Sequence, residues 1–255
     1  MRRVVLVLAT MALAILLAGG VAQAIINGQP DRNAHPYVGM VYNDEFLCSG
    51  TVISPRVFLT AAHCTEVFEQ GDSKVYVTFE QRADFKPDDA YVGIPHTHPR
   101  NNGLFPDVGV VVLEKPVRMA SYGALPDSGL VDTLKEGQRL TTVGYGARGF
   151  DLGSEPPLQP QPVRTNHRYR ATVRLLNTRD PHIGEMFVKT MGVSLIKGKG
   201  EASCFGDSGG PLFLPDQQTI VGITKTSTIA PLCRGPNYYQ RVDLPQVLKW
   251  VRSFP

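Results

Sequence analysis

Apolar and polar positions alternate with a period of two along much of the chain, which is typical of half-buried β-strands. Val75, Val77 and Phe79 alternate in this way with Tyr76 and Thr78. Val108 to Leu113 is instead a continuous apolar run, as expected of a strand that is buried on both faces. Further segments of strand character are Leu140 to Val143, Ala171 to Leu176, Met186 to Thr190 and Thr219 to Thr224. The pattern predicts a structure built mostly of β-strands.

Two later segments depart from this period. The prolines of "GSEPPLQPQP", residues 153–162, indicate an exposed loop between the two halves of the chain. Near the C-terminus, Asp243 and Gln246 form a possible capping pair for a helix. Apolar residues then recur on one helical face, at Leu244, Val247, Leu248 and Val251. We therefore expect a short amphipathic helix over about 243–254.

The first 24 residues have the features of an export signal. Arg2 and Arg3 form a charged start, Val4 to Ala18 is almost wholly apolar, and Ala22-Gln23-Ala24 is a small-x-small cleavage site. An uncleaved membrane anchor is the alternative, but the apolar run is shorter than the roughly 20 residues that a spanning helix needs. We expect a secreted, extracellular protein that begins at Ile25 and makes no membrane contact once the signal is removed.

Composition supports the β-rich interpretation and narrows the function. Apolar residues make up 42% of the chain and charged residues 19%, and 25 Gly and 20 Pro supply many turns. The net charge is +3, of which Arg2 and Arg3 contribute two, so the remainder carries about +1. The remaining lysines and arginines form no basic stripe of the kind that binds nucleic acid, so nucleic-acid binding is not expected.

The four cysteines are interpreted as disulfides because the chain is expected to be exported. Four cysteines permit three pairings. The segment "SGTVISPRVFLTAAH" between Cys48 and Cys64 has the pattern of two strands joined by a turn, so a local bridge is geometrically plausible. Cys204 and Cys233 would then form the second bridge. No C-x-x-C spacing occurs, so a zinc site is not expected.

The most distinctive chemistry lies in "EASCFGDSGGPLF", in which Ser208 stands among glycines. Residues 206–210 satisfy the G-x-S-x-G pattern of α/β-hydrolases, whose catalytic order is serine, acid, histidine. The last histidine of this chain is His182, upstream of Ser208, so that design lacks its base. A histidine and an aspartate do precede the serine, His63 in "LTAAHC" and Asp107 in "FPDVGVVVL".

With "TAAHC" and "GDSGGP" in this order, the chain from Ile25 onward resembles the chymotrypsin-like (trypsin family) serine proteases. "DVGVVVL" and the "GYG" that begins at Gly144 resemble the corresponding family motifs less closely. The resemblance implies an all-β fold of two packed six-stranded antiparallel β-barrels with a short C-terminal helix. The N-terminal barrel would span about 25–130 and the C-terminal barrel about 131–242, with the active site between them.

The same resemblance implies a serine endopeptidase that works through an acyl-enzyme. A serine hydroxyl is a poor nucleophile until a base takes its proton, so Ser208 would attack, His63 would accept the proton and Asp107 would orient the imidazole. The backbone amides of Gly206 and Ser208 would form the oxyanion hole. We expect no cofactor, protein or peptide substrates, a protein protease inhibitor as a further candidate partner, and a monomeric enzyme.

The residues expected at the specificity pocket depart from the family pattern. Ala202 stands six residues before the serine, where trypsin-like members carry an aspartate that binds basic side chains. Ser227, Ile229 and Asn237 are the other expected pocket residues, and all are neutral. We therefore expect a preference for apolar or small side chains on the acyl side of the cleaved bond.

The family's Ser-Trp-Gly segment, which pairs with the substrate backbone, is absent from "GITKTSTIAPLC". Counting back from Cys233 places Ser227-Thr228-Ile229 at that position, whereas counting forward from Gly222 places Lys225-Thr226-Ser227 there. We favour the first alignment, because it keeps a serine available to support Asp107.

The resemblance also implies an activation step at the new N-terminus. In the family, a freed Ile or Val amine pairs with the aspartate that precedes the nucleophile, which is Asp207 here. Ile25 directly follows the expected cleavage site, so removal of the signal would release that amine. Cleavage after Gly20 or Ala22, which would leave a short activation peptide, is the alternative.

Two other functions fit the same sequence. A non-catalytic protease homologue could act as a binding module, although such proteins usually lack one of the three catalytic residues. An ester-preferring hydrolase would use the same machinery. Separately, His96 and His98 form an H-x-H pattern, but no third ligand stands at convincing spacing for a metal. The remaining histidines, His35, His167 and His182, are interpreted as loop residues.

Overall fold

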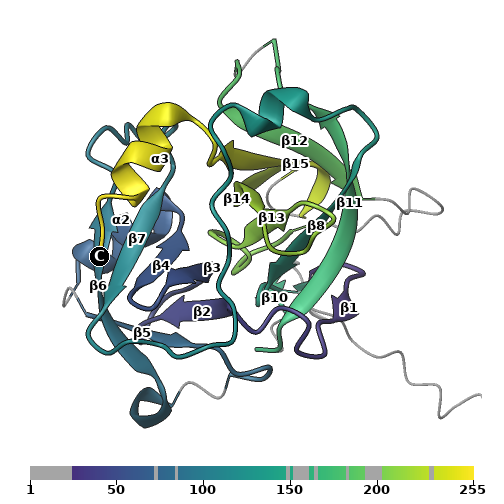
Figure 1. Ribbon diagram of the computed structural model, residues 1–255. Coiled ribbons are helices and arrows are strands. Elements are labelled where there is room, and N and C mark those ends of the chain that lie inside the picture. Colours follow the sequence, from purple (N-terminus) through teal and green to yellow (C-terminus); the bar gives the residue numbers. More distant parts are fainter. Residues whose placement is uncertain are drawn as a thin grey trace, which may run out of the picture.

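The computed structural model describes residues 25–71, 74–83, 86–147, 150–151, 161–163, 166–181, 184–192, 203–229 and 233–255. Figure 1 shows two β-barrels lying side by side, the first formed by the purple-to-teal part of the chain and the second by the teal-to-yellow part. The expected all-β, two-barrel architecture is confirmed. The signal sequence and most of the proline-rich segment lie outside the described residues.

The N-terminal barrel is a closed antiparallel sheet in the order β2-β3-β4-β7-β6-β5. Its strands are β2 (Val38–Tyr42), β3 (Leu47–Ser54), β4 (Val57–Thr60), β5 (Val75–Thr78), β6 (Tyr91–Thr97) and β7 (Gly109–Leu113). A helix, α2 (Ala62–Glu69), follows β4, and a 3-10 turn, η1 (Pro87–Asp89), precedes β6. The barrel interior is filled by valine, leucine and phenylalanine side chains of these strands.

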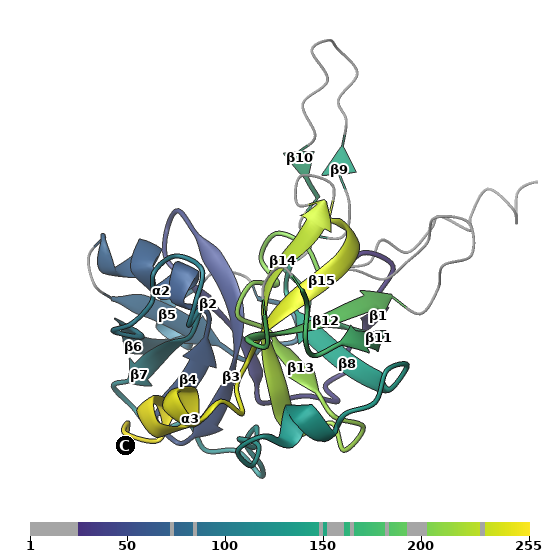
Figure 2. The ribbon, with the colours of Figure 1, turned by 90° about the horizontal axis from the view of Figure 1, so that it is seen from above.

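The C-terminal barrel is closed because β11 pairs with both β8 and β12 in an otherwise linear antiparallel order. Its strands are β8 (Arg139–Gly144), β11 (Tyr169–Asn177), β12 (Phe187–Gly192), β13 (Pro211–Phe213), β14 (Ile220–Ile229) and β15 (Arg234–Arg241). A 3-10 turn, η2 (Leu130–Thr133), precedes β8. The short pair β9 (Phe150–Asp151) and β10 (Gln161–Pro162) stands away from the barrel, as Figure 2 shows.

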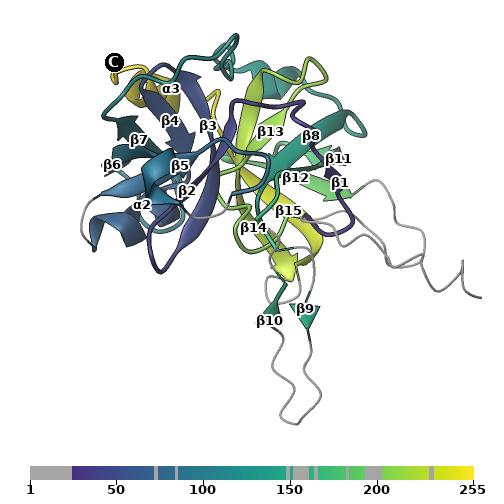
Figure 3. The same cartoon turned by 90° about the horizontal axis from the view of Figure 1, so that it is seen from below.

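Each barrel is completed by the opposite end of the chain. The first strand, β1 (Gln29–Pro30), pairs with β11 of the C-terminal barrel. The last helix, α3 (Pro245–Val251), lies against the N-terminal barrel, as Figures 1 to 3 all show. Its buried face belongs to the same apolar cluster as the strands of that barrel: Val247, Leu248 and Val251.

A buried cation joins the two barrels. Arg168, just before β11, is fully buried and donates to the backbone carbonyls of Val38 at 2.8 Å and Phe79 at 2.9 Å, in the N-terminal barrel. Its charge is paired with Asp31 at 2.9 Å. His35 also bonds to Asp31; it lies in the loop between β1 and β2, as expected, but it is fully buried there. A buried charge is tolerated only when it is paired and hydrogen-bonded, as it is here.

The predicted strands occur close to their expected positions, but two local predictions need correction. The helix α2 was not expected. The helix at the C-terminus is shorter than 243–254, and Asp243 does not cap it: the residue at the N-cap is Leu244, which makes no side-chain cap. Asp243 instead pairs with the buried guanidinium of Arg241 at 2.8 Å and accepts a hydrogen bond from the Val131 N–H.

Both expected disulfides are present, Cys48–Cys64 and Cys204–Cys233. The first joins β3 to α2 and the second joins the loop before β13 to the start of β15. The first disulfide therefore fixes the segment that carries His63, and the second fixes the segment that carries Ser208. Within the described ranges, no helix is both long enough and apolar enough to cross a membrane.

Candidate active site

His63 lies in the first turn of α2, immediately after β4. The next residue, Cys64, is tied to β3 through its disulfide with Cys48. About a third of the His63 side chain, 34%, is exposed. The imidazole is therefore held on a fixed helix while one edge stays open to solvent.

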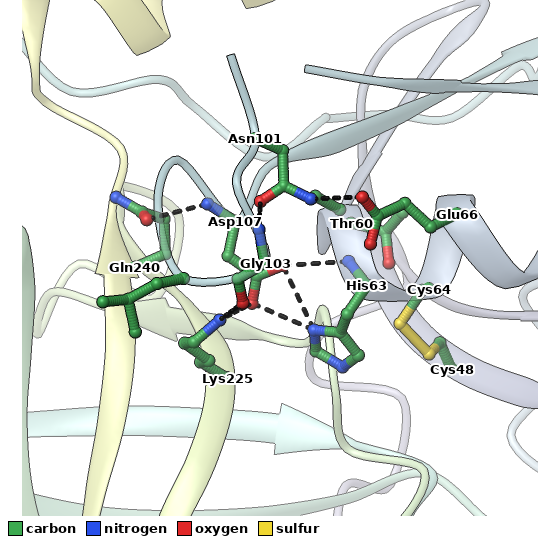
Figure 4. Close-up of polar contacts among 12 residues, drawn as sticks. Cys48, Thr60, His63, Cys64, Glu66, Asn101, Gly103, Asp107, Lys225 and Gln240 are labelled. Atoms are coloured by element: carbon green, nitrogen blue, oxygen red, sulfur yellow. Dashed lines mark hydrogen bonds and ion pairs between the residues drawn. A yellow bond between two sulfur atoms is a disulfide. The ribbon is translucent and has the colours of Figure 1, made fainter. Parts of the chain in front are cut away.

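Asp107 lies just before β7 and is buried against His63 (Figure 4). Its Oδ1 accepts the backbone N–H of His63 at 2.9 Å, and the imidazole Nδ1 lies 2.9 Å from Oδ2. The Asp107 N–H donates to Gln240 Oε1 at 2.9 Å. A proton on Nδ1 makes this contact a hydrogen bond and leaves Nε2 as the acceptor, which is the form that a general base needs.

The glycine after Val108 explains how the strand of Asp107 approaches the helix of His63. A Cβ on Gly109 would lie 2.5 Å from Thr65 Oγ1 and 2.7 Å from the Ala61 carbonyl. Neither distance is compatible with a side chain, so "DVG" at this point allows β7 to pack directly on α2.

The Asp107 carboxyl is held in its charged form. Burial raises its pKa, but the hydrogen bond and charge of His63 and the ammonium of Lys225 outweigh that effect and lower the pKa to about 2. The carboxylate is therefore ionised throughout the range in which imidazole can act as a base.

Lys225 corrects the alignment favoured from the sequence. Its Nζ lies 3.0 Å from Asp107 Oδ2, whereas Ser227 stands two residues further along β14 and makes no contact with Asp107 among the described residues. The serine was expected to support Asp107, but bulges in the pairing of β14 with β15 make the count back from Cys233 unreliable. The count forward from Gly222 is the one that the structure follows.

Ser208 lies in the loop before β13, close to the end of β4. Its carbonyl accepts the Ser49 N–H at 2.8 Å. The next residue, Gly209, has φ +80°, and a Cβ there would lie 2.0 Å from Thr60 Oγ1 and 2.9 Å from the Ala61 N. This close approach seats Ser208 next to the segment that leads into His63. No hydrogen bond joins Ser208 Oγ to His63 in the described part of the chain; such contacts often tighten only when substrate binds.

The backbone around Ser208 leaves two amide donors unused. The N–H groups of Asp207, Gly209 and Gly210 all donate to backbone carbonyls. In contrast, those of Gly206 and Ser208 donate to no group within the described residues. Gly206 has φ +97°, a conformation that favours glycine. Two free donors with one residue between them are suited to holding an oxyanion.

Asp207 is buried, and no cation is paired with it among the described residues. Its two oxygens accept the N–H groups of Gly146 and Cys204, each at 2.8 Å. Burial raises the pKa of the carboxyl to about 7, although these hydrogen bonds lower it. Ile25, which is still joined to residue 24, is buried separately against Tyr169 and Ala171. The expected pairing of Ile25 with Asp207 is not formed in this unprocessed chain.

The raised pKa of Asp207 predicts a pH-dependent stability for the unprocessed chain. The unfolded carboxyl loses its proton near pH 3.8, but the folded one keeps it up to about pH 7. The folded state therefore binds more protons between these values, and the free energy of unfolding should fall by up to about 4 kcal/mol as the pH rises from 4 to 7. Urea unfolding at both pH values, on Ser208→Ala protein that retains residues 21–24, measures this fall.

Asp207→Asn in the same background is the matched control, because it removes only the titration at this position. The expected fall in stability should be smaller in this variant by roughly the amount that Asp207 contributes. Equal pH dependence in the two proteins would show that the Asp207 carboxyl does not titrate in this range.

A small pocket of about 80 Å³ opens beside Ser208. It is lined by Ser203, Cys204, Phe205, Ser208, Thr224, Lys225, Thr226, Ser227 and Cys233. Asn237 is fully buried and lies across from Ser227 in the β14–β15 pairing, so the two side chains project from the same face of the sheet. Both polar atoms of the Asn237 amide lack a hydrogen-bond partner in the described part of the chain, and Asn237 is not one of the residues that line the pocket. Ala202 and the side chain of Ile229 lie outside the described residues.

The other histidines of the described chain have structural surroundings. The His96 ring packs on Phe254 at 5.3 Å and the His98 ring on Trp250 at 4.9 Å. His167 lies in an isolated bridge with Arg82, and His182 is outside the described residues. One group of possible metal ligands is found in the described part, Cys48, His63 and Cys64, but the two sulfurs are joined in a disulfide and cannot serve as thiolate ligands.

Comparison with known proteins gives one consistent result. The model of the Trypsin family matches residues 25–251. The chain is 26% identical to beta-fibrinogenase mucrofibrase-4 of Protobothrops mucrosquamatus over 242 residues, covering 91% of this chain and 88% of that protein. It is also 26% identical to a chymotrypsin of Phaedon cochleariae, with 90% and 81% covered. Among solved structures, HL collagenase superimposes with a TM-score of 0.69 at 20% identity, covering 90% of this chain and 97% of that one.

Proposed function

The chain belongs to the trypsin family of serine endopeptidases, and we propose that it cleaves peptide bonds with Ser208 as nucleophile, His63 as base and Asp107 as the residue that orients the base. The observation that carries this assignment is the Asp107–His63 pair, hydrogen-bonded at 2.9 Å and partly open to solvent on the imidazole side. The two unused amides beside Ser208 support it.

The proposed reaction has two halves. His63 Nε2 takes the proton of Ser208 as the Oγ attacks the substrate carbonyl, and Asp107 stabilises the imidazolium. The Gly206 and Ser208 N–H groups hold the oxyanion, which in related sites contributes about 3 kcal/mol per donor. His63 then gives the proton to the leaving amine. Water, activated by the same imidazole, hydrolyses the acyl-enzyme and releases Ser208.

A serine-directed fluorophosphonate tests the proposed nucleophile directly. We expect one equivalent of the probe to attach to the peptide that contains Ser208, and no label after the protein has been heat-unfolded. Folded protein that takes up no probe would be a binding module rather than an enzyme. Turnover of matched peptide and ester substrates then shows which bond the enzyme prefers.

We further propose that the protein acts outside the cell. The apolar N-terminal segment would direct export, and the two disulfides support an oxidising destination. Signal removal before Ile25 would release an amine able to pair with Asp207. Protein or peptide substrates follow from the family, and a protein inhibitor that occupies the same site is a candidate partner.

The pocket beside Ser208 predicts the selectivity of cleavage. It holds about 80 Å³, and no carboxylate lines it among the described residues. A lysine or arginine side chain would be buried there without a partner, which costs about 3 kcal/mol, or about 100-fold in kcat/KM. Profiling with a peptide library should therefore show cleavage after small or apolar residues at least 100-fold above cleavage after arginine.

The Asn237→Gly variant serves as a matched test of the pocket. It removes a buried amide that has no hydrogen-bond partner among the described residues and that lies across from the pocket residue Ser227, so we expect the pocket to deepen and accept larger apolar residues. Preferential cleavage after arginine by the parent enzyme, abolished by Glu201→Gln, would instead place an acid in the pocket and contradict the prediction.

A further inference from the structure

Lys225 is held in a defined position on the far side of Asp107 from His63 (Figure 4). Its side chain projects from β14 and is only 14% exposed. The Nζ donates to Asp107 Oδ2 at 3.0 Å and to the Gly103 carbonyl at 3.4 Å. The Phe187 ring of β12 lies under the ammonium, 6.0 Å from its centroid. These contacts distinguish Lys225 from a mobile surface lysine.

We propose that Lys225 is a positioning residue for the catalytic base: it anchors the Asp107 carboxylate and, through its charge, extends the activity of His63 to lower pH. This inference rests on the proposed function of His63 and Asp107. One of the two alignments of "GITKTSTIAPLC" places Lys225 at the family's Ser-Trp-Gly position, and the structure adds the contact of its ammonium with Asp107.

That Lys225 anchors Asp107 follows from the hydrogen bonds that the Asp107 carboxylate accepts. In the described part of the chain, the donors to its oxygens are the His63 N–H, the His63 Nδ1 and the Lys225 ammonium. Gln240 contacts only the Asp107 backbone. Without the ammonium, His63 alone would fix the orientation of a carboxylate that is 2% exposed. Lys225 therefore supplies, among the described residues, the donor to the carboxylate that does not come from His63.

The effect of the Lys225 charge on His63 follows from the position of both side chains at the same oxygen, Asp107 Oδ2. Lys225 Nζ and His63 Nδ1 both lie about 3 Å from Asp107 Oδ2, so the two nitrogens are within about 6 Å of each other. A cation at this separation repels an imidazolium and therefore favours the neutral imidazole. The neutral imidazole is the active form, so the cation extends activity toward acid.

Other titratable groups on the surrounding elements have their own partners. Glu66 of α2 accepts from the Asn101 amide at 2.6 Å, and Glu69 accepts from the Thr97 N–H at 2.8 Å. His98, at the end of β6, accepts from the Arg100 N–H and packs on Trp250. None of them contacts Asp107 among the described residues, so Lys225 is the group whose charge acts on the pair.

The test compares Lys225→Met with Lys225→Arg and with Lys135→Met, a control at an exposed lysine. We expect the acid limb of kcat/KM to move up by about one pH unit in Lys225→Met, with KM changed less than twofold and kcat lowered. Lys225→Arg should keep the parental limb, and Lys135→Met should match the parent. An unmoved limb in Lys225→Met overturns the proposal, whatever happens to kcat.

A second measurement does not depend on turnover. In the Ser208→Ala background, the protonation of His63 is followed by NMR of its imidazole carbons, with and without Lys225→Met. The midpoint should rise by about one pH unit when the ammonium is removed, and equal midpoints overturn the inference. A parent that shows this difference but neither hydrolyses peptides nor takes up fluorophosphonate would refute the proposed function while leaving the effect of Lys225 standing.

Discussion

Ser208→Ala should lower kcat/KM for peptide hydrolysis by about 10⁴-fold or more, because the variant lacks the atom that forms the acyl-enzyme. The folded structure should be unaffected. The Ser208 side chain is only partly buried and makes no hydrogen bond within the described residues, so the free energy of unfolding should change by less than about 0.5 kcal/mol. Steady-state kinetics and urea unfolding measure the two quantities on the same preparation.

His63→Ala should lose nearly as much activity, and the double variant should be no worse than either single one. Residues that act as one unit are not additive, because removal of the nucleophile leaves nothing for the base to activate. Ser128→Ala, at an exposed serine, is the control and should retain full activity. If Ser208→Ala kept more than about 1% of the parental rate, the nucleophile would have to be another residue.

The second large effect is expected at the N-terminus. A chain that begins at Ile25 should be active, whereas one that retains residues 21–24 should be about 10²- to 10³-fold less active. The reason is the Asp207 carboxyl, which is buried in the unprocessed chain with no cation paired to it among the described residues. Loss of one partner of a buried ion pair typically costs about 3 to 5 kcal/mol, and the loop that Asp207 anchors carries the proposed oxyanion hole.

Asp207→Asn in the chain that starts at Ile25 should reproduce the loss, and Asp127→Asn, at an exposed aspartate, should not. Kinetics on refolded protein with defined N-termini give the comparison. N-terminal sequencing of secreted, active material provides an independent check. Full activity in protein that starts before Ile25 would mean that the freed amine is not required.

Features carried by a regular pattern or by a recognised motif could be predicted, and the partners of buried charged groups could not. The strands follow from the period of two, and the pairing of His63 with Asp107 follows from motifs whose chemistry needs both. The sequence left two alignments of the segment around Lys225 open, so it could not decide that Lys225 contacts Asp107, 118 residues away. Bulges in β14 shift the register on which the choice depends. The partner of a buried charge is set by the packed barrels rather than by spacing.

The two helices illustrate the same limit. The residues of α2 that are buried include Cys64 and Phe68, but the segment is only eight residues long and has no side-chain cap at its start. It depends on its disulfide and on packing against β6 and β7 rather than on a helix signal. Asp243 has the sequence position of a helix cap but forms an ion pair with Arg241. Leaving a buried guanidinium unpaired costs more free energy than leaving a helix without its side-chain cap.

The exchange of chain ends between the barrels sets the order in which this protein can assemble during synthesis. β1 can pair only after β11 has been synthesised, since Gln29 pairs with Arg170. The N-terminal barrel likewise lacks the apolar face of α3 until residues 245–251 have been made. The nascent chain therefore carries His63 and Asp107 for most of translation without a finished cleft around them. Both barrels can therefore be completed only when nearly the whole chain has been made.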